Sequence, residues 1–274
     1  MNSVAQKYDE VYMLVIHEKN DGTVEERLDG FVYETYFFVF DKQVMATEMT
    51  DHITMTIYGV KDGITYKSKE LFSGSVAELA VGKIREYEGK NDLKKCTAFA
   101  DMLNFGAAVQ RYMGETTDLA DEYLGEYAKY ATADMPALDY DNQIISNGER
   151  YEAFTVSMSM QSILEINLGF LYDLTSCEAH VTVDGQTTKY AIEPMEGYAG
   201  IYTIRIPIGA TNVRTVYEIC VKTADGEQVT PTYRCSAEGC TKDRMVTSSN
   251  ESLKNMMVAM MKYGEAVIEA YPSA

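Results

Sequence analysis

Four Asp-Gly pairs at matched intervals divide this 274-residue chain into two similar halves. The pairs are Asp21-Gly22 and Asp62-Gly63 in the first half, and Asp184-Gly185 and Asp225-Gly226 in the second. Within each half the pairs are 41 residues apart, and the two halves are offset by 163 residues. Asp-Gly readily adopts the positive φ angles that a tight hairpin needs, so each pair predicts a turn between two strands.

The segments around these turns alternate between apolar and polar residues, which is typical of strands with one buried face. Residues 11–17 and 23–28 flank the first turn, and residues 179–183 and 187–192 flank its counterpart. An aromatic and aliphatic run follows in each half, at 36–40 and 201–206. A further alternating run precedes the second turn of each half, at 53–57 and 217–221. The sequence therefore predicts two sheets built in the same order.

Each half ends in an expected amphipathic helix, and the two helices share a motif. Residues 102–109 resemble residues 260–267, and an aromatic residue precedes a glycine in both, as Phe105-Gly106 and Tyr263-Gly264. We expect the helices to begin near Asn91 and near Asn250, with Pro272 ending the second. Because a mid-helix glycine costs about 1 kcal/mol relative to alanine, its presence in both copies predicts a helix-to-sheet contact too close for a Cβ.

The halves also differ. The first contains an additional expected helix at 76–87, opened by a capping box at Ser75 and Glu78. A linker helix is expected at 119–131, capped by Asp118. The second half has an extra hairpin at its start, at 152–158 and 163–172, and nothing before Val11 can supply its equivalent in the first half.

Three explanations of this difference stay open: the first copy lacks the hairpin, the given sequence begins downstream of it, or another chain or a preceding domain supplies it. A sheet without an expected strand would expose unpaired N–H and C=O groups, which favours strand addition.

These patterns predict an α+β chain that is predominantly β. We expect two tandem β-sandwich-like units, each capped by an amphipathic helix. The first unit would comprise residues 1–131 with its helices, and the second residues 149–274 with the C-terminal helix. The polar segment 132–148, which contains Pro136, would link them.

Charge and cysteine content limit the partners. A formal net charge of −18 disfavours nucleic acid, and no apolar run is long enough for membrane insertion. The five cysteines cannot all pair, and Cys235 and Cys240, expected in a loop-like stretch, could be bridged or free. Their spacing and the three histidines do not suggest a zinc site.

No pattern in the sequence indicates catalysis. There is no phosphate-binding loop, metalloprotease motif or nucleophile elbow. Asp51 and His52 are more simply explained as a turn-capping aspartate beside a surface histidine. Residues 139–142 resemble a calcium loop only faintly, because the required glycine and distal glutamate are missing. We therefore expect no enzyme, and no catalytic, cofactor-binding or metal-binding residues.

Two sets of residues carry a family resemblance. One contains Lys61 to Tyr66, Ser75 to Ala80 and Ala100 to Tyr112; the other contains Val181 to Gly185, Tyr202 to Pro207 and Ser252 to Tyr271. Over about residues 30–112 and 150–271 the chain resembles a repeated module of large secreted proteins from Gram-positive gut anaerobes. The resemblance implies an extracellular, non-catalytic, mostly β module. It assigns no functional residues.

The expected function is a structural or adhesive module at the cell surface or in the extracellular space. Tyrosine numbers 21 and tryptophan is absent, which suits protein contacts. The module would associate with protein partners or with itself through sheet edges. The alternative is a carbohydrate-binding module of a secreted glycan-degrading system. We expect any export signal, which is not present in this chain, to have been removed or to lie outside the given sequence.

Overall fold

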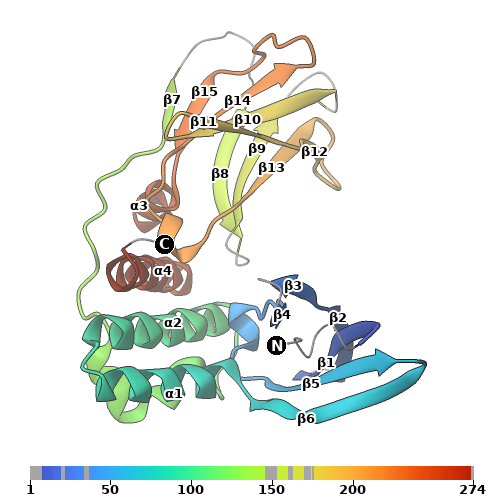
Figure 1. The fold of residues 1–274 in the computed structure, drawn as a ribbon. Helices are drawn as coiled ribbons and strands as arrows, with labels where there is room; N and C mark the ends of the chain where they lie inside the picture. The colour runs from blue at the N-terminus through green and yellow to red at the C-terminus, as the bar shows by residue number, and fades with distance from the viewer. Residues whose placement is uncertain are drawn as a thin grey trace.

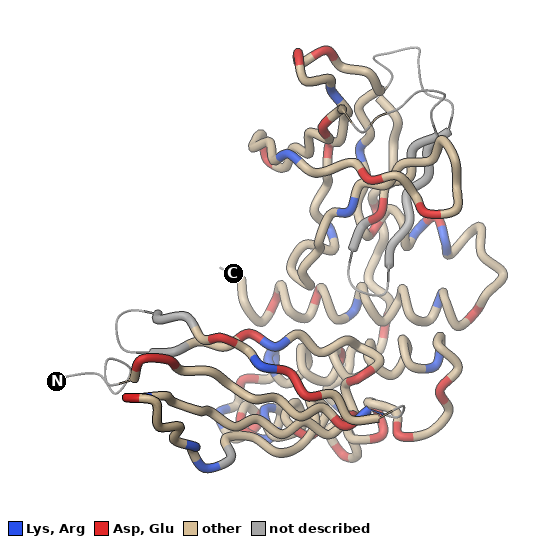
Figure 2. Tube along the Cα trace, turned by 90° about the vertical axis from the view of Figure 1, so that its right-hand side faces the viewer, with Lys and Arg blue, Asp and Glu red and all other residues tan. Residues whose placement is uncertain are grey.

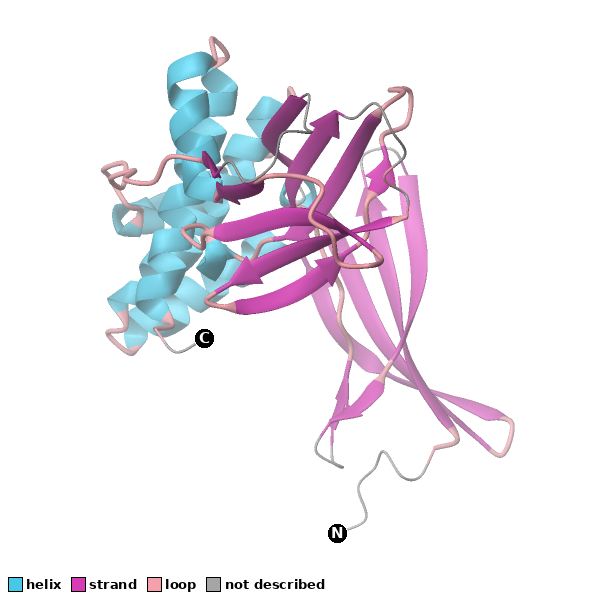
Figure 3. Cartoon of the chain, turned by 90° about the horizontal axis from the view of Figure 1, so that it is seen from above, coloured by secondary structure: helices cyan, strands magenta, loops and turns pink. Residues whose placement is uncertain are grey.

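The computed structural model describes residues 8–19, 22–33, 37–145, 153–159, 163–169, 174 and 176–272. The expected α+β class is confirmed: three antiparallel sheets and a separate two-stranded ribbon combine with helices, and helix and strand make up comparable shares. Seen from above, the helices gather on one side and the sheets extend away from them (Figure 3).

The first half contains a four-stranded sheet with the order β2-β1-β5-β6. Its strands are β1 (Glu10–Lys19), β2 (Gly22–Asp29), β5 (His52–Lys61) and β6 (Ile64–Gly74). Alternation in β1 and β5 brings Met13, Val15 and Ile53 onto one buried face. The two-stranded ribbon of β3 (Phe31–Tyr33) and β4 (Phe37–Val39) follows β2.

The second half contains a five-stranded sheet with the order β11-β10-β14-β15-β7. Its strands are β10 (Cys177–Val183), β11 (Gln186–Tyr190), β14 (Tyr217–Thr223), β15 (Thr232–Cys235) and β7 (Gln143–Ile145). The first four repeat the succession β2-β1-β5-β6 of the first half. The last strand, β7, belongs to the segment that was expected to be a linker. It pairs with β15 and so extends this sheet.

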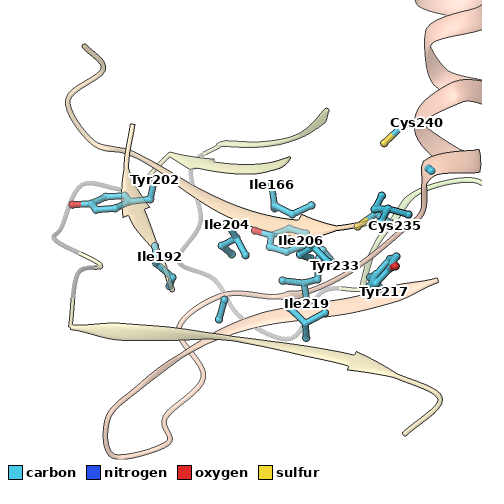
Figure 4. Packing of buried hydrophobic residues seen from close by; sticks show 14 of the residues in the cluster. Ile166, Ile192, Tyr202, Ile204, Ile206, Tyr217, Ile219, Tyr233, Cys235 and Cys240 are labelled. Atoms are coloured by element: carbon cyan, nitrogen blue, oxygen red, sulfur yellow. The ribbon is translucent and has the colours of Figure 1, made fainter. Parts of the chain in front are cut away.

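A second sheet, with the order β12-β13-β9-β8, packs on this one. It is made of β8 (Ala153–Ser159), β9 (Ile163–Gly169), β12 (Glu193–Pro194) and β13 (Ile201–Pro207). Ile166 and Ile204 from this sheet meet Ile219 and Tyr233 from the other, and all four are fully buried (Figure 4). The β8–β9 hairpin lies where the sequence predicted it, as far as the described residues extend.

Two of the predicted turns have the expected backbone. Asp62 and Gly63 have φ angles of 50° and 75°, and Asp184 and Gly185 have 49° and 78°. Gly226 also has a positive φ, 86°. Asp21, which belongs to the remaining turn, lies outside the described residues.

The helices of the first half follow β6 directly. Ser75 caps α1 (Val76–Gly89) in the predicted capping box, accepting from the Glu78 N–H at 3.1 Å while the Glu78 carboxylate accepts from the Ser75 N–H at 2.9 Å. Asp92 caps α2 (Leu93–Tyr112), one residue beyond the expected start.

The segment predicted to be a linker helix has a different structure. It is a 3-10 segment, η3 (Ala120–Tyr130), interrupted at Gly125, where φ is 50°. Leu119 takes the N-cap position. Asp118 does not cap the segment; its carboxylate accepts a hydrogen bond from the Tyr123 hydroxyl at 2.9 Å.

The second half ends in α3 (Ala237–Thr247) and α4 (Glu251–Ala270). Asn250 caps α4 as predicted, by accepting from the Leu253 N–H at 3.1 Å. The prediction of a loop around Cys235 and Cys240 is wrong, because Cys235 ends β15 and Cys240 lies in α3. Ser236 caps that helix, accepting from the Gly239 N–H at 2.9 Å.

The shared glycines make equivalent contacts in the two halves. A Cβ on Gly106 would overlap the Met49 sulfur, and one on Gly264 would lie 2.7 Å from Val213 Cγ1. Met49 follows η2 (Ala46–Glu48), and Val213 follows η4 (Ala210–Asn212). The glycines therefore do exclude a Cβ, but the close partner is a short 3-10 turn ahead of a strand and not the sheet itself.

The two halves pack together through α2 and α4 (Figure 1). The rings of Phe105 and Tyr263 stack with centroids 6.1 Å apart. These residues are equivalent in the shared helix motif, and contact between equivalent residues is typical of a two-fold interface. Val109 of α2 also joins the core of the second half, so the two halves share apolar packing.

Candidate interaction surface

The most evident difference between the halves lies beside β4. In the second half Tyr202 and Thr203 of β13 pair with Pro194 and Glu193 of β12. In the first half Phe38 and Val39 of β4 pair with Val32 and Phe31 of β3. The β13 and β4 residues in these pairs are offset by 164 residues, which is also the offset between η4 and η2. Strand β4 is therefore the counterpart of β13.

Strand β13 is paired along its whole length on its second edge. Its seven residues, Ile201 to Pro207, pair in antiparallel register with Gly169 to Ile163 of β9. The Thr203 hydroxyl also donates to Asn167 Oδ1 of β9 at 2.8 Å. Strand β8 pairs next to β9 and completes this sheet.

The corresponding edge of β4 has no strand beside it among the described residues. Strand β4 pairs only with β3 there. The residues that follow, Asp41 to Val44, form no backbone hydrogen bond with any described residue. The chain from β4 to η2 nevertheless keeps an alternating pattern, because Phe40 and Val44 pack on the Met13, Val15 and Ile53 cluster while Asp41 and Gln43 are exposed. We call the run from Asp41 to Val44 the open edge.

The core under the open edge is smaller than its counterpart. Only three described residues of the first sheet, Met13, Val15 and Ile53, form its fully buried cluster. The cluster of the second half draws residues from both of its sheets, from α3 and α4, and from Val109 of α2. Phe40 and Val44 of the extended segment pack on the apolar face of this one full sheet.

A polar pair replaces apolar residues at one position of this smaller core. His17 pairs with Ile53 in the sheet register, as Val181 pairs with Ile219 in the second half. His17 is 2% exposed and its Nε2 lies 3.0 Å from Asp51 Oδ2. His52 is a surface histidine, as the sequence indicated, and its Nε2 lies 3.1 Å from the Ser73 hydroxyl.

Burial raises the pKa of the Asp51 carboxyl, although the hydrogen bond from His17 opposes that shift. Burial and the nearby charges of Asp51 and Asp118 also raise the pKa of Glu115. At Glu48 burial acts against ionisation, but the hydrogen bonds from Lys19 and from the Met45 N–H lower the pKa. This group lies beside the sheet end and η2.

Two shallow cavities lie elsewhere. One, of about 320 Å³, is lined by residues of β10, β11 and β14, namely Val181, Val183, Asp184, Gln186, Thr188, Tyr190 and Tyr217. The other, of about 410 Å³, lies between β6 and α1. Tyr217 is only 6% exposed, so it offers little ring surface to the first cavity.

The faint calcium-loop pattern at 139–142 has a structural role. Asp141 forms an ion pair with Lys242 at 3.0 Å, and Asn142 Oδ1 accepts from the Ser236 N–H at 3.1 Å. The Asp139 N–H donates to Glu238 Oε1 at 2.7 Å. These contacts fasten the segment to α3. No cluster of three potential metal ligands occurs within the described part of the chain.

The cysteines are unbridged. Cys235 and Cys240 are free thiols, and burial raises the pKa of both, that of Cys240 to about 11. A raised pKa keeps a thiol protonated and unreactive at neutral pH.

Acidic and basic residues are scattered over both halves in Figure 2.

None of the described helices has the length and apolar character needed to cross a membrane. No protein-family model matches the sequence, and a search of curated proteins finds no significant match. The candidate surface therefore depends on the geometry alone.

Proposed function

We propose that the chain is a non-catalytic structural or adhesive module that acts outside the cell and associates with itself through sheet edges. The single observation that carries this proposal is the open edge that follows β4, whose counterpart in β13 is paired with β9. An unpaired strand edge is a ready template for another strand. The sequence resemblance to modules of large secreted proteins supports the extracellular setting.

The finer reading of the fold belongs to the same proposal. The chain would be two copies of one sheet-plus-helix unit, with sandwich-like packing and helices against the sheets. Three parallels support this reading: the repeated strand order, the equivalent glycine contacts at Gly106 and Gly264, and the Phe105–Tyr263 stack. The first copy would differ by lacking the strands that cover its second layer.

Sedimentation velocity of the intact chain over a hundredfold concentration range tests the proposal. Association through backbone edges predicts species that grow with concentration. Because backbone pairing carries no net charge, we expect association to persist in 0.5 M salt, where screening is strong. A single monomeric species at every concentration would contradict the self-association.

The second candidate, carbohydrate binding, depends on the cavity beside β11. Gln186 and Thr188 offer hydrogen-bonding groups there, and Tyr190 offers a half-buried ring. A glycan array tests it: binding lost in Tyr190→Ala but kept in Tyr66→Ala, a change at an exposed tyrosine of the other half, would support this candidate. An array without hits would remove it.

A further inference from the structure

A groove lies between the end of β6 and α1. We propose that this groove binds an extended, uncharged strand of another polypeptide, which pairs antiparallel with β6. The groove is the cavity of about 410 Å³, lined by Phe72 to Gly74 of β6 and by one face of α1 that includes Leu79, Gly82 and Lys83. It is separate from the open edge, so its occupation does not depend on the self-association proposed above.

The second half contains the same arrangement of strand and helix. Strand β15 runs directly into α3 as β6 runs into α1, and a serine caps each helix, Ser75 in the first half and Ser236 in the second. These serines set an offset of 161 residues between the two arrangements. Strands β6 and β15 also hold the same place in the two strand orders.

In the second half the groove is filled by residues 139–145, which we call the strap. Its strand β7 lies beside β15 (Figure 1), and Gln143 to Ile145 pair in antiparallel register with Arg234 to Thr232. Ahead of β7 the strap lies against α3, because a Cβ on Gly239 would lie 2.7 Å from Asn142 Cγ. The strap therefore occupies the space between the strand edge and the first turn of the helix.

The partners of the strap correspond to residues that line the groove of the first half. Four lining positions have counterparts that pair with or contact the strap. These correspondences are Phe72 and Tyr233, Ser73 and Arg234, Glu78 and Gly239, and Leu79 and Cys240. Within the described part of the chain, β6 pairs only with β5, whereas β15 pairs with β14 on one side and β7 on the other. The first half thus presents the same groove without a strap.

Glu78 already supplies one of the contacts that the strap makes. Its carboxylate accepts from the Ser75 N–H at 2.9 Å, as Asn142 Oδ1 accepts from the Ser236 N–H at 3.1 Å. The helix end of the groove is therefore satisfied by the chain itself. What the groove lacks is a counterpart of β7, so the partner needs an extended strand at least as long as β7, which has three residues.

The composition of β6 shows which part of its edge can accept a strand. Charged side chains discourage pairing at an edge, and β6 carries Lys67 and Lys69 before it reaches α1. The part beside α1, Leu71 to Gly74, has no charge. Leu71 and Leu79 are 56% and 50% exposed, so an apolar side chain of the partner would remove apolar surface from water there.

Charge defines the partner strand further. Among the lining side chains, Lys83 pairs with Glu86 at 2.9 Å, and Glu78 is held in the capping box. The lining therefore contains two carboxylates and one amine, in a chain of net charge −18, which disfavours an acidic strand. An uncharged strand of β-branched apolar residues fits both the edge and the charge.

A peptide titration of the full chain tests this site. The probe is a peptide blocked at both ends that copies Tyr140 to Ile145 and carries Asp141→Asn, because Lys242, the ion-pair partner of Asp141, corresponds to Val81 in the first half. Amide NMR shifts of the ¹⁵N-labelled chain locate the binding as peptide is added to about 1 mM. We expect shifts at residues 71–74 and 78–83, and none at residues 232–240.

Two variants form a matched pair. A Cβ on Gly82 or on Gly89 meets no atom within 4 Å, so a larger side chain can be placed at either position of α1, but only Gly82 lines the groove. Gly82→Tyr should raise the dissociation constant of the peptide at least about tenfold by filling the groove. Gly89→Tyr should leave it unchanged within about twofold.

Methylated peptides test the backbone pairing itself. N-methylation of the peptide amides that face β6 should abolish binding, because main-chain hydrogen bonds supply the affinity in strand addition. N-methylation of the alternate amides, which face away, should be tolerated. If Gly82→Tyr does not fold, this comparison decides on the unmodified chain.

Several results would overturn the site. These are shifts confined to β15 and α3, which would mean that the peptide displaces the strap; no shift at about 1 mM peptide; equal affinity in Gly82→Tyr and Gly89→Tyr; and equal binding of the two methylated peptides. Shifts at residues 71–83 when the chain alone is concentrated would assign the groove to a second copy and overturn the assignment to another polypeptide. Self-association through the open edge is decided separately, by sedimentation.

Discussion

At the scale of single residues, Gly106 and Gly264 are the strongest link between sequence and packing. We predict that Gly264→Ala lowers the free energy of unfolding by about 1–3 kcal/mol, because the new Cβ would crowd the Val213 side chain and lie 3.0 Å from the Ala210 carbonyl oxygen. The control is Gly82→Ala in the interior of α1, where no atom lies within 4 Å. It should raise stability by about 0.5–1 kcal/mol. Urea unfolding measures both, and equal effects would contradict the close contact.

Asp101 leads to a pH-dependent prediction. It is 1% exposed, and burial raises its pKa although the Thr132 N–H and hydroxyl donate to its carboxylate at 3.0 and 2.5 Å. Because the folded state holds the proton to higher pH than the unfolded chain, stability falls as pH rises from about 4 through the folded-state pKa. Asp101→Asn removes this contribution.

The variant should therefore gain stability relative to the unmodified chain as pH rises across that window. Urea titrations at several pH values measure the difference, and Asp134→Asn, at an exposed position, controls for the loss of a charge. A difference that stays constant with pH, or that changes in the opposite direction, would show that the native state does not retain the Asp101 proton.

At the scale of elements, Arg214 links α3, α4 and the segment that contains Ala137 through hydrogen bonds. Its guanidinium donates to Glu238 of α3 at 2.6 Å, to Glu265 of α4 and to the Ala137 carbonyl oxygen at 2.9 Å. The Glu238 side chain is 4% exposed, so removing its cation leaves a buried carboxylate. We predict that Arg214→Ala costs about 3 kcal/mol of unfolding free energy.

A double variant separates the buried charge from lost packing. Adding Glu238→Gln to Arg214→Ala should recover part of the stability, because the amide needs no cation. Arg205→Ala, which breaks the ion pairs of a half-exposed β13 arginine with Glu165 of β9 and Glu193 of β12, should cost less than about 1 kcal/mol. If Arg214→Ala were as mild as Arg205→Ala, the network would not hold the elements together.

The elements also show how much of the fold could be predicted from the sequence. The turn at Asp184-Gly185, the capping box at Ser75 and the start of α4 at Asn250 were predictable because each depends on a few neighbouring residues. Helix α3 was not predicted from the sequence. Its buried face includes the polar residues Glu238 and Thr241, so apolar residues do not recur along it with a clear helical period. The cap at Ser236 was the available signal.

The candidate surface was only partly predictable, for a related reason. The extra hairpin of the second half is a local pattern, so the unequal strand content could be seen in the sequence. The matching registers of β4 and β13 required coordinates, because pairing between distant segments leaves no local mark. The same holds for His17 and Asp51, which are 34 residues apart in the chain.

At the scale of the whole molecule, the two halves are joined through α2 and α4. We propose that they are related copies of unequal completeness, because the described residues leave the open edge unpaired while its counterpart in the second half is paired with β9. This difference is the reason that self-association is expected at the end of the molecule where the open edge lies.

Hydrogen exchange at the backbone amides of β4 and β13 tests this central claim most directly. At low concentration we predict fast exchange over residues 41–44 and slow exchange over residues 203–206, since only the second run is paired. Raising the concentration should slow exchange over residues 41–44 and leave β13 unchanged. Equal protection of both runs in the dilute monomer would contradict the open edge, and with it the account given above.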